Sequence, residues 1–251
     1  MKACIVLHPD ASKRLIAKGV VALPAVKRAL TSGIVVITLG TTNALVAEEV
    51  LGNPVDRGAF VTGFIDDRWN INARLGEAGE MVLKKGKAVA LSSQQLLDSL
   101  SVGDVIIKGG NALDPWGTVG VLMGSPTGGT VGRYLSCALA RGVDLILPIG
   151  LEKAVHSSIT DVARELGSGR LDLTMGLPCG MQPIVGRVVT EIDALETLFP
   201  VEVTQIAAGG IGKGAGSVSL LIKGEEKAVR AAFDLVQSLL SESGPHLTGS
   251  A

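Results

Sequence analysis

The chain has 251 residues, of which 47% are apolar, 19% charged and 3% aromatic. This apolar share is enough for a large buried core and excludes an intrinsically disordered chain. The formal net charge of −1 and the scarcity of aromatic side chains exclude a bulk attraction to nucleic acid or to an anionic membrane surface. No run of about 18 apolar residues is present, so we expect no membrane span and a cytoplasmic location.

Apolar residues at helical spacing between Leu15 and Leu30 predict a helical segment that Pro24 kinks or divides into two. Residues 34–39 are a continuous β-branched and aliphatic run, typical of a strand buried on both faces. A short polar turn follows, and residues 44–51 have a helical pattern. Strand, tight turn and helix in this order indicate the first unit of an α/β fold.

The same alternation continues along the chain. Strands are predicted over 87–91, 104–108 and 143–148, and helices over 94–100, 129–140 and 159–166. This order predicts a mostly parallel, Rossmann-like sheet with helices on both faces, and we assign residues 1–180 to such an α/β ligand-binding core. In sheets of this kind ligands bind at the carboxyl ends of the strands.

The C-terminal part has a different pattern. Strands are predicted over 184–189, 201–206 and 217–222, and helices over 191–199 and 225–240, with Thr190 as N-cap of the first helix. The order β-α-β-β-α predicts a ferredoxin-like α+β subdomain over residues 181–243, followed by a flexible tail at 244–251.

The glycine-rich stretch 209–216 lies between two predicted strands, so it indicates a hairpin, or a lid over a ligand, and not a dinucleotide site. The three cysteines, Cys4, Cys137 and Cys179, lie far apart and form no Cys-x-x-Cys pair. This spacing predicts neither a disulfide framework nor a metal site. We expect no cofactor.

Three glycine-rich loops follow predicted strands or precede predicted helices. Backbone N–H groups at a helix start are unpaired and attract anions, and glycine lets a ligand approach the main chain. Each feature also has an ordinary structural explanation. The turn at Gly40 could be a helix cap, the loop that begins at Gly109 a glycine hinge with an Asx turn, and Lys108 a strand-end lysine that extends to solvent. Arg133 falls in the first turn of a predicted helix, where the helix dipole disfavours a cation unless an anion is near. The predicted ligand-binding residues are Gly40, Thr41, Thr42, Asn43, Lys108, Gly110, Asn111, Gly128, Gly129, Thr130 and Arg133.

Asp114, Lys153 and His156 are the candidates for acid–base catalysis. Asp114 follows the second glycine loop, but it also precedes Pro115, and Asp-Pro commonly opens a turn. Lys153 and His156 follow a predicted strand and share a face if that segment is helical; a surface histidine at a helix start is the alternative. A polar cluster at 66–72 indicates a substrate-binding loop, a subunit contact or a solvated hairpin.

Patches of residues 30–155 resemble a known superfamily. Residues 35–43 and the following helix resemble the first strand–loop–helix of ribose-5-phosphate isomerase, where the loop binds the substrate phosphate. Residues 104–114, the Gly129-Thr130 helix start and residues 142–144 resemble the core of translation initiation factor 2B subunits and methylthioribose-1-phosphate isomerases. Those proteins have Asp in a Gly-Ala-Asp turn where this chain has Asn111, and an amide cannot act as a general base. Glucosamine-6-phosphate deaminases and CoA transferases belong to the same superfamily.

The resemblance and the loops together predict a protein that binds a small phosphorylated or anionic metabolite similar to a sugar phosphate, with an aldose–ketose isomerase type of reaction. Asn111 favours the alternative of a non-catalytic metabolite sensor or assembly protein. A CoA- or folate-handling transferase or ligase is the second alternative, for which Glu152 is the nearest candidate for a glutamate nucleophile. We expect a small-molecule partner, neither nucleic acid nor membrane, and self-association into a homo-oligomer.

Overall fold

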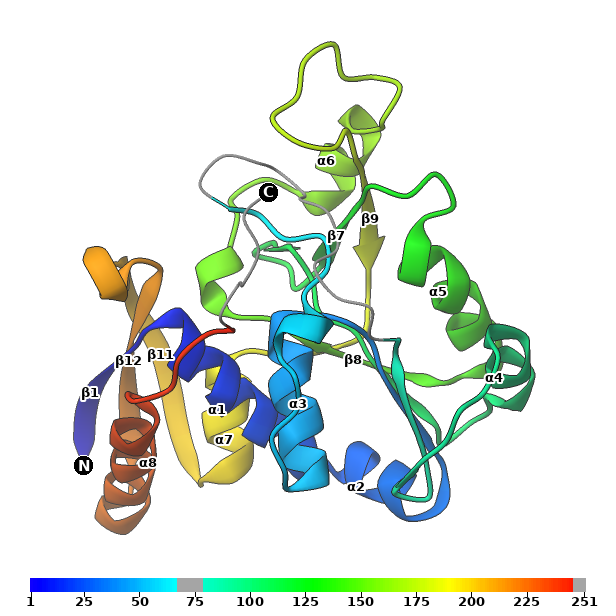
Figure 1. The fold of residues 1–251 in the computed structure, drawn as a ribbon. Helices are drawn as coiled ribbons and strands as arrows, with labels where there is room; N and C mark the ends of the chain where they lie inside the picture. The colour runs from blue at the N-terminus through cyan, green and yellow to red at the C-terminus, as the bar shows by residue number, and fades with distance from the viewer. Residues whose placement is uncertain (67–78, 246–251) are drawn as a thin grey trace.

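A six-stranded sheet in the order β10-β8-β5-β2-β3-β4 forms the centre of the structure, a computed structural model that describes residues 1–66 and 79–245 (Figure 1). Strands β2, β5, β8 and β10 are parallel, whereas β3 and β4 continue the sheet in antiparallel pairs. The strands of this sheet are β2 (Ile34–Ile37), β3 (Met81–Lys84), β4 (Lys87–Ala88), β5 (Val105–Ile107), β8 (Asp144–Pro148) and β10 (Arg187–Val189).

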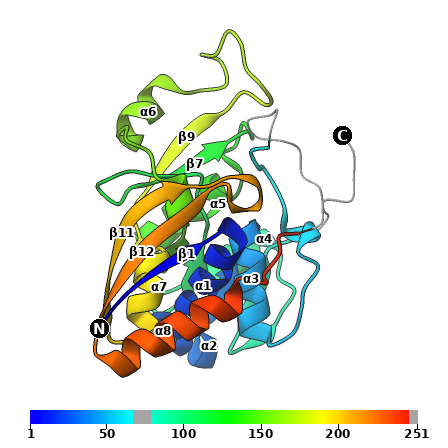
Figure 2. The same ribbon diagram turned by 90° about the vertical axis from the view of Figure 1, so that its left-hand side faces the viewer.

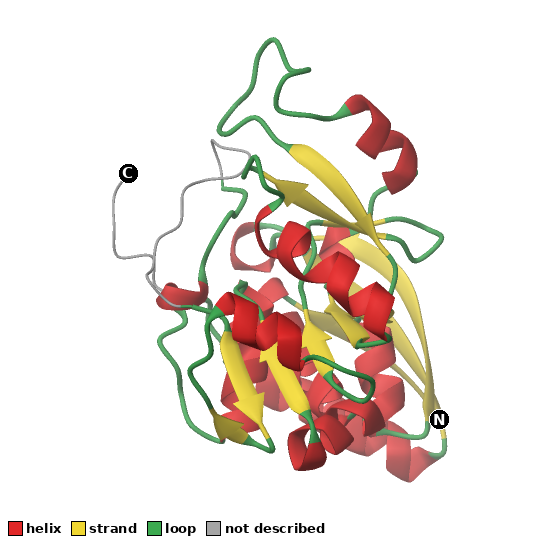
Figure 3. Ribbon diagram, turned by 90° about the vertical axis from the view of Figure 1, so that its right-hand side faces the viewer, coloured by secondary structure: helices red, strands yellow, loops and turns green. Residues whose placement is uncertain are grey.

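Helices cover both faces of this sheet (Figure 3). Alternate side chains of β2 point to opposite faces, and all of them are buried, as expected for a strand that is covered on both sides. Val35 and Ile37 pack with apolar residues of α1, α3 and α7, whereas Ile34 and Val36 pack with residues of α4 and α5. The helices on the first face, with α2 at its end, are α1 (Pro9–Ala22), α2 (Pro24–Ser32), α3 (Thr41–Leu51) and α7 (Glu191–Leu198). Those on the second are α4 (Ser93–Ser99) and α5 (Gly129–Arg141). The described residues therefore form a mixed α/β fold with a mostly parallel central sheet.

A second, antiparallel sheet has the order β1-β12-β11 and lies beside α1, α7 and α8 (Figure 2). One face of this sheet belongs to the same apolar cluster as α1 and the central sheet, so the two sheets share one core. Its elements are β1 (Lys2–Leu7), β11 (Val201–Gly209), β12 (Ser217–Gly224) and α8 (Glu226–Leu239), with the short 3-10 turn η3 (Gly212–Gly214) between β11 and β12.

A third sheet, β6-β7-β9, lies beyond the carboxyl ends of the central strands, next to α6. It consists of β6 (Ala112–Leu113), β7 (Val119–Met123) and β9 (Gly180–Ile184), with α6 (Ile159–Glu165) packed on β9. Two further 3-10 turns are η1 (Gly58–Phe60) and η2 (Leu151–Lys153). Among the described helices, none is both long and apolar enough to cross a bilayer.

Many of the predicted elements are confirmed, but the ferredoxin-like arrangement expected for residues 181–243 is wrong. Pro24 does separate two helices, and Thr190 caps α7 with a capping box. The strand predicted over 184–189 divides at Gly186 into β9 and β10, which belong to different sheets. Gly186 packs against Leu145, where a Cβ atom would lie 2.7 Å from the Leu145 carbonyl oxygen. The place beside β12 is taken by β1, an N-terminal strand that the local sequence pattern did not predict.

Two arginines and two glutamates form a closed ring of hydrogen bonds that joins α1, α3 and the segment after α8. Arg14 and Arg57 each donate to both Glu48 and Glu242. Burial would raise the pKa of Glu48, but hydrogen bonds from Arg57 and Arg14 outweigh it and lower this pKa to about 2. The charge of Glu48 is therefore maintained in the folded protein by two cations that have no equivalent contact in the unfolded chain.

Replacing Glu48→Gln should lower the free energy of unfolding at pH 7 by about 2 kcal/mol, because it removes one of the two carboxylates that Arg14 and Arg57 share and leaves only Glu242. The effect is smaller than for a fully buried pair, since the Arg57 side chain is 24% exposed. Urea unfolding measures the change. The control is Glu226→Gln, which removes an exposed pair with Arg230 and should alter stability little. Equal stability of the two variants would contradict the role of the ring.

Candidate functional site

A cleft of about 910 Å³ lies at the carboxyl ends of β2, β5 and β8. The three segments that follow these strands contribute to its lining, together with the end of β7 and the start of α5. Many of the residues predicted to bind a ligand therefore line one cavity. They are Gly40, Thr41, Thr42, Asn43, Lys108, Gly110, Asn111, Gly128, Gly129, Thr130 and, from the predicted catalytic set, Lys153.

The first wall of the cleft is the N-terminus of α3. Gly40 precedes the helix with φ of 150°, a backbone conformation that L side chains rarely adopt. Its N–H donates to the Phe60 carbonyl, and its own carbonyl accepts the N–H of Ala44. The N–H groups of Thr41, Thr42 and Asn43 lie in the first turn, where an α-helix provides no acceptor. These donors carry the partial positive charge of the helix start at the lining of the cleft.

Asn43 connects this wall to the next strand. Its Nδ2 donates to the carbonyls of Thr38 and Ile107 at 2.9 and 3.2 Å, and thus ties the ends of β2 and β5 together. The side chain is only 1% exposed, and its Oδ1 has no hydrogen-bond partner among the described residues. An unsatisfied buried acceptor is costly, and this Oδ1 is not exposed to the cleft, so the role of Asn43 is to hold the two strand ends and the helix start together.

The second wall is the N-terminus of α5. Gly128 and Gly129 have φ of 74° and 55°, which only glycine adopts without strain. A Cβ at Gly132 would overlap the Thr127 carbonyl oxygen, so the turn before the helix packs tightly on its first residues. The first-turn N–H groups of Gly129, Thr130 and Val131 again have no intrahelical acceptor. Two helix N-termini thus line the same cleft, a suitable arrangement for a ligand anion.

Three lysines add positive charge to the cleft: Lys13, Lys108 and Lys153. The ammonium groups of Lys108 and Lys153 donate to the carbonyls of Gly109 and Gly110, both at 3.0 Å. Burial lowers the pKa of Lys108 to about 8, with a smaller contribution from the charge of Lys153. Burial also lowers the pKa of Lys153, but Glu152 and Glu191 oppose this shift.

Two carboxyl groups lie beside Lys153. Glu152 lines the cleft, and its Oε2 is buried, packed against Gly150, without a hydrogen-bond partner in the described part of the chain. Glu191, at the start of α7, is fully buried and accepts the N–H of Leu151 at 2.9 Å, so it holds the η2 turn that carries Glu152 and Lys153. Burial, together with the charge of Glu152, raises the pKa of Glu191 to about 7. A carboxylate whose side chain lines a cleft can transfer protons.

Three predicted residues do not line the cleft. Asp114 accepts the backbone N–H groups of Trp116, Thr118 and Ile159, so it closes a turn and caps α6. His156 is exposed. Arg133 donates to both carboxylate oxygens of Glu80, at 2.9 and 3.0 Å, and this internal pair neutralises the cation near the helix start.

Other residues that the sequence pattern singles out have different outcomes. Asn111 does line the cleft, but its Oδ1 accepts the N–H of Leu122 and thereby secures the β6–β7 hairpin. Positions 67–72 of the polar cluster lie outside the described residues. Glu191 was missed, because nothing in its sequence context distinguishes it from an ordinary acidic residue in the first turn of a helix.

The chain matches no protein-family model, and neither a curated protein sequence nor a solved structure is significantly similar to it. Within residues 1–66 and 79–245, no group of three or more His, Cys, Asp or Glu side chains is arranged to hold a metal ion. The function of the site therefore has to be inferred from its own geometry.

The buried carboxyl of Glu191 predicts a pH dependence of stability. The folded protein binds its proton with a pKa of about 7, against 4.5 for an ordinary glutamate, so the free energy of unfolding falls as the pH rises from about 4.5 to about 7 and then stays level. Glu191→Gln keeps an acceptor for the Leu151 N–H and removes this dependence. We expect the variant to gain stability relative to the wild type between pH 5 and pH 8, by on the order of 1–3 kcal/mol.

Urea unfolding at the two pH values measures this difference. Glu165→Gln, at an exposed carboxylate at the end of α6, is the control and should retain the wild-type pH dependence. If the Glu191→Gln and wild-type proteins lost equal stability between pH 5 and pH 8, the carboxyl of Glu191 would not titrate in this range.

Proposed function

We propose that the cleft binds a small metabolite with a phosphate or another anionic group, similar in size to a sugar phosphate. The observation that carries this proposal is the shared lining of one cleft by the N-termini of α3 and α5 and by Lys108 and Lys153. Unpaired N–H groups and ammonium groups are the donors that bind phosphate in proteins. The formal net charge of the chain is −1, so the attraction for an anion is a local property of the cleft.

The rest of the lining favours a ligand that also carries hydroxyl groups. The carboxylate of Glu152 and the hydroxyls of Thr41 and Thr130 belong to residues that line the cleft, and they suit hydroxyl groups of the ligand. Leu39, Val61 and Phe64 provide apolar lining beside them. An anionic group at the helix N-termini and hydroxyls near Glu152 would satisfy both kinds of wall, which is the pattern of a phosphorylated sugar.

We assign proton transfer in an aldose–ketose type of reaction to Glu152, in place of Asp114 and His156. A carboxylate in the cleft can remove a proton from the hydroxyl-bearing carbon next to a carbonyl group and return it to the carbonyl carbon, while the hydroxyl proton moves to the former carbonyl oxygen. Lys153 is adjacent in the chain and is held by the Gly110 carbonyl, so a cation remains next to the carboxylate. This assignment agrees with the resemblance to the ribose-5-phosphate isomerase superfamily, where phosphate binding and isomerisation occur together.

Calorimetry with inorganic phosphate and a panel of sugar phosphates tests the binding proposal. We expect one or more members of the panel to bind, and Lys153→Gln to weaken that binding by about tenfold or more, because a charge-assisted hydrogen bond is lost. The matched control is Arg133→Gln, which removes the same charge from a side chain paired with Glu80 outside the lining and should leave affinity unchanged. Equal weakening by both variants, or no binding across the panel, would contradict the assignment.

A second pair of variants tests the helix N-terminus itself. Thr41 is the first residue of α3, a position where proline is tolerated and only removes an N–H that has no intrahelical acceptor. Thr41→Pro should therefore weaken phosphate binding several-fold more than Thr41→Ala, which removes the hydroxyl but keeps the amide. Equal affinities of the two variants, measured by the same calorimetry, would show that this amide does not bind the anion.

A further inference from the structure

Lys108 differs from the other lysines of the cleft because no carboxylate accompanies it. Lys13 pairs with Asp10 at 3.2 Å, and Lys153 lies in the field of Glu152 and Glu191. Lys108 has no ion pair among the described residues, and its ammonium group donates to the Gly109 carbonyl. The charged form of Lys108 is therefore stabilised by a carbonyl dipole alone.

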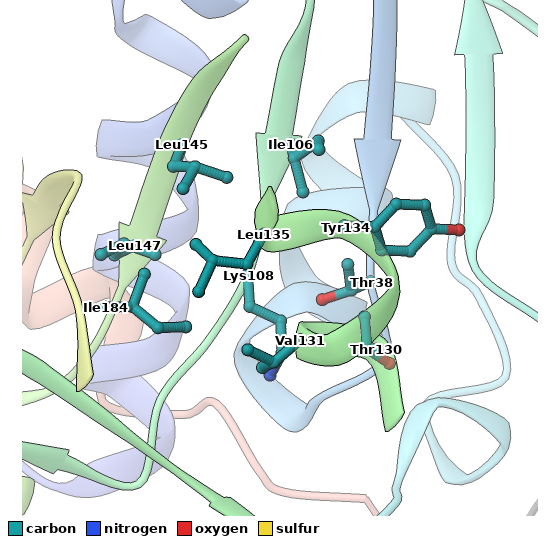
Figure 4. Close-up of a pocket in the computed structure, with 10 residues that line it drawn as sticks. All are labelled: Thr38, Ile106, Lys108, Thr130, Val131, Tyr134, Leu135, Leu145, Leu147 and Ile184. Atoms are coloured by element: carbon teal, nitrogen blue, oxygen red, sulfur yellow. The ribbon is translucent and has the colours of Figure 1, made fainter. Parts of the chain in front are cut away.

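The side chain of Lys108 also borders a second, smaller pocket that adjoins the cleft and is shown in Figure 4. Apolar side chains of the central sheet, of α5 and of β9 line this pocket, and in the figure Lys108 extends past Leu135 so that its amine ends beside Val131. The two pockets share Lys108, Thr130 and Val131. The amine thus reaches the anion-binding cleft from an apolar pocket.

These surroundings favour the neutral amine. Removing an ammonium group from water without a counter-ion disfavours its charge, and a second cation nearby adds repulsion. The ionisable side chains that share the two pockets with Lys108 are Lys13, Glu152, Lys153 and Tyr134. Burial and the charge of Lys153 lower the pKa of Lys108 to about 8, so roughly a tenth of the amine is unprotonated at pH 7, far more than for an ordinary lysine. An unprotonated lysine amine is a nucleophile toward carbonyl compounds.

We propose that Lys108 is a catalytic nucleophile that forms an imine with an anionic aldehyde or ketone bound in the cleft. The Nζ lone pair attacks the carbonyl carbon, a C–N bond forms, and one amine proton moves to the carbonyl oxygen. The second amine proton and the resulting hydroxyl then leave as water, and the C=N bond forms. This inference rests on the proposed function, because the helix N-termini that hold the anion would place the carbonyl beside Lys108.

An imine at Lys108 suits reversible proton removal at the carbon next to it. Glu152 removes that proton and returns it to the same carbon, and water then hydrolyses the C=N bond and releases the carbonyl compound. The aldose–ketose shift itself proceeds on the free carbonyl compound, because returning the proton to the imine carbon would leave a C–N single bond that water does not cleave. A protonated imine withdraws electrons more strongly than a ketone and makes the neighbouring C–H more acidic. Lys108 and Glu152 come from the segments after β5 and β8, two neighbouring parallel strands, and line the same cleft. The cleft then contains both the group that activates the substrate and the group that moves its proton.

Trapping with pyridoxal 5′-phosphate, an aldehyde that carries a phosphate, tests the inference in the full chain. The protein is incubated with the aldehyde, reduced with borohydride, and digested for mass spectrometry. We expect labelling at Lys108 at concentrations at least tenfold below those that label the exposed Lys227, with a pH midpoint near 8 in place of the value of about 10 for an ordinary lysine. Lys108→Arg, which retains the charge, should lose this labelling, whereas Lys153→Arg should retain it.

The arms of the experiment separate this inference from the proposed function. Inorganic phosphate should protect Lys108 from pyridoxal phosphate but not from pyridoxal, which lacks the phosphate. If calorimetry shows phosphate binding and Lys108 is labelled no more readily than Lys227, the nucleophile is overturned and the anion site stands. If Lys108 reacts with both aldehydes at the expected pH but phosphate neither binds nor protects, the nucleophile stands and the proposed function fails.

Discussion

The parallel alignment of β2, β5 and β8 is the constraint on which the cleft depends. Val36 lies opposite Ile106, and Ile106 opposite Leu145, so the three strands run in the same direction and their carboxyl ends meet at one edge of the sheet. Each strand is followed by a turn that has to leave the sheet at this edge. Segments more than 100 residues apart in the sequence, such as Gly40 and Lys153, are thereby brought to one cavity. The apolar side chains that are buried when these strands form the sheet thus also bring the parts of the site together.

Lysine and glutamate side chains lie close together at the cleft, and the surroundings of each side chain determine the direction of its pKa shift. Lys108 lies against apolar side chains, and burial lowers its pKa, whereas Lys153 is accompanied by Glu152 and Glu191. Glu191 is buried beneath the η2 turn, and its pKa rises toward neutrality. Burial therefore lowers the pKa of two lysines of the cleft and raises the pKa of a glutamate beneath it, and such shifts are common at catalytic sites. The Arg14–Glu48–Arg57–Glu242 ring is different, because each carboxylate there has its cations and remains charged.

Local patterns predicted which turns would form the cleft but not which ionisable groups would face it. The loops at Gly40 and Gly128 are predictable because each contains a glycine with positive φ directly before a helix, and this backbone conformation depends on the glycine itself. Asp114 and His156 were chosen for their position after strands, and both lie outside the cleft, since a carboxylate can instead satisfy backbone N–H groups of its own turn. The sequence pattern offers Glu152 only as the nucleophile of the second alternative and gives no reason to single out Glu191. Their placement depends on how α7 packs against the η2 turn, a contact between segments 40 residues apart.

The sequence by itself determined the alternation of strands and helices, the division of the first helical segment at Pro24 and the two glycine-rich helix starts, because each of these is fixed by residues close together in the chain. Only the tertiary structure decided that β1 pairs with β12, that the strand after residue 180 divides between two sheets, and that Arg133 is neutralised by Glu80. These features depend on hydrogen bonds and burial between distant segments, and such interactions stabilise the protein only when the folded core brings the segments together.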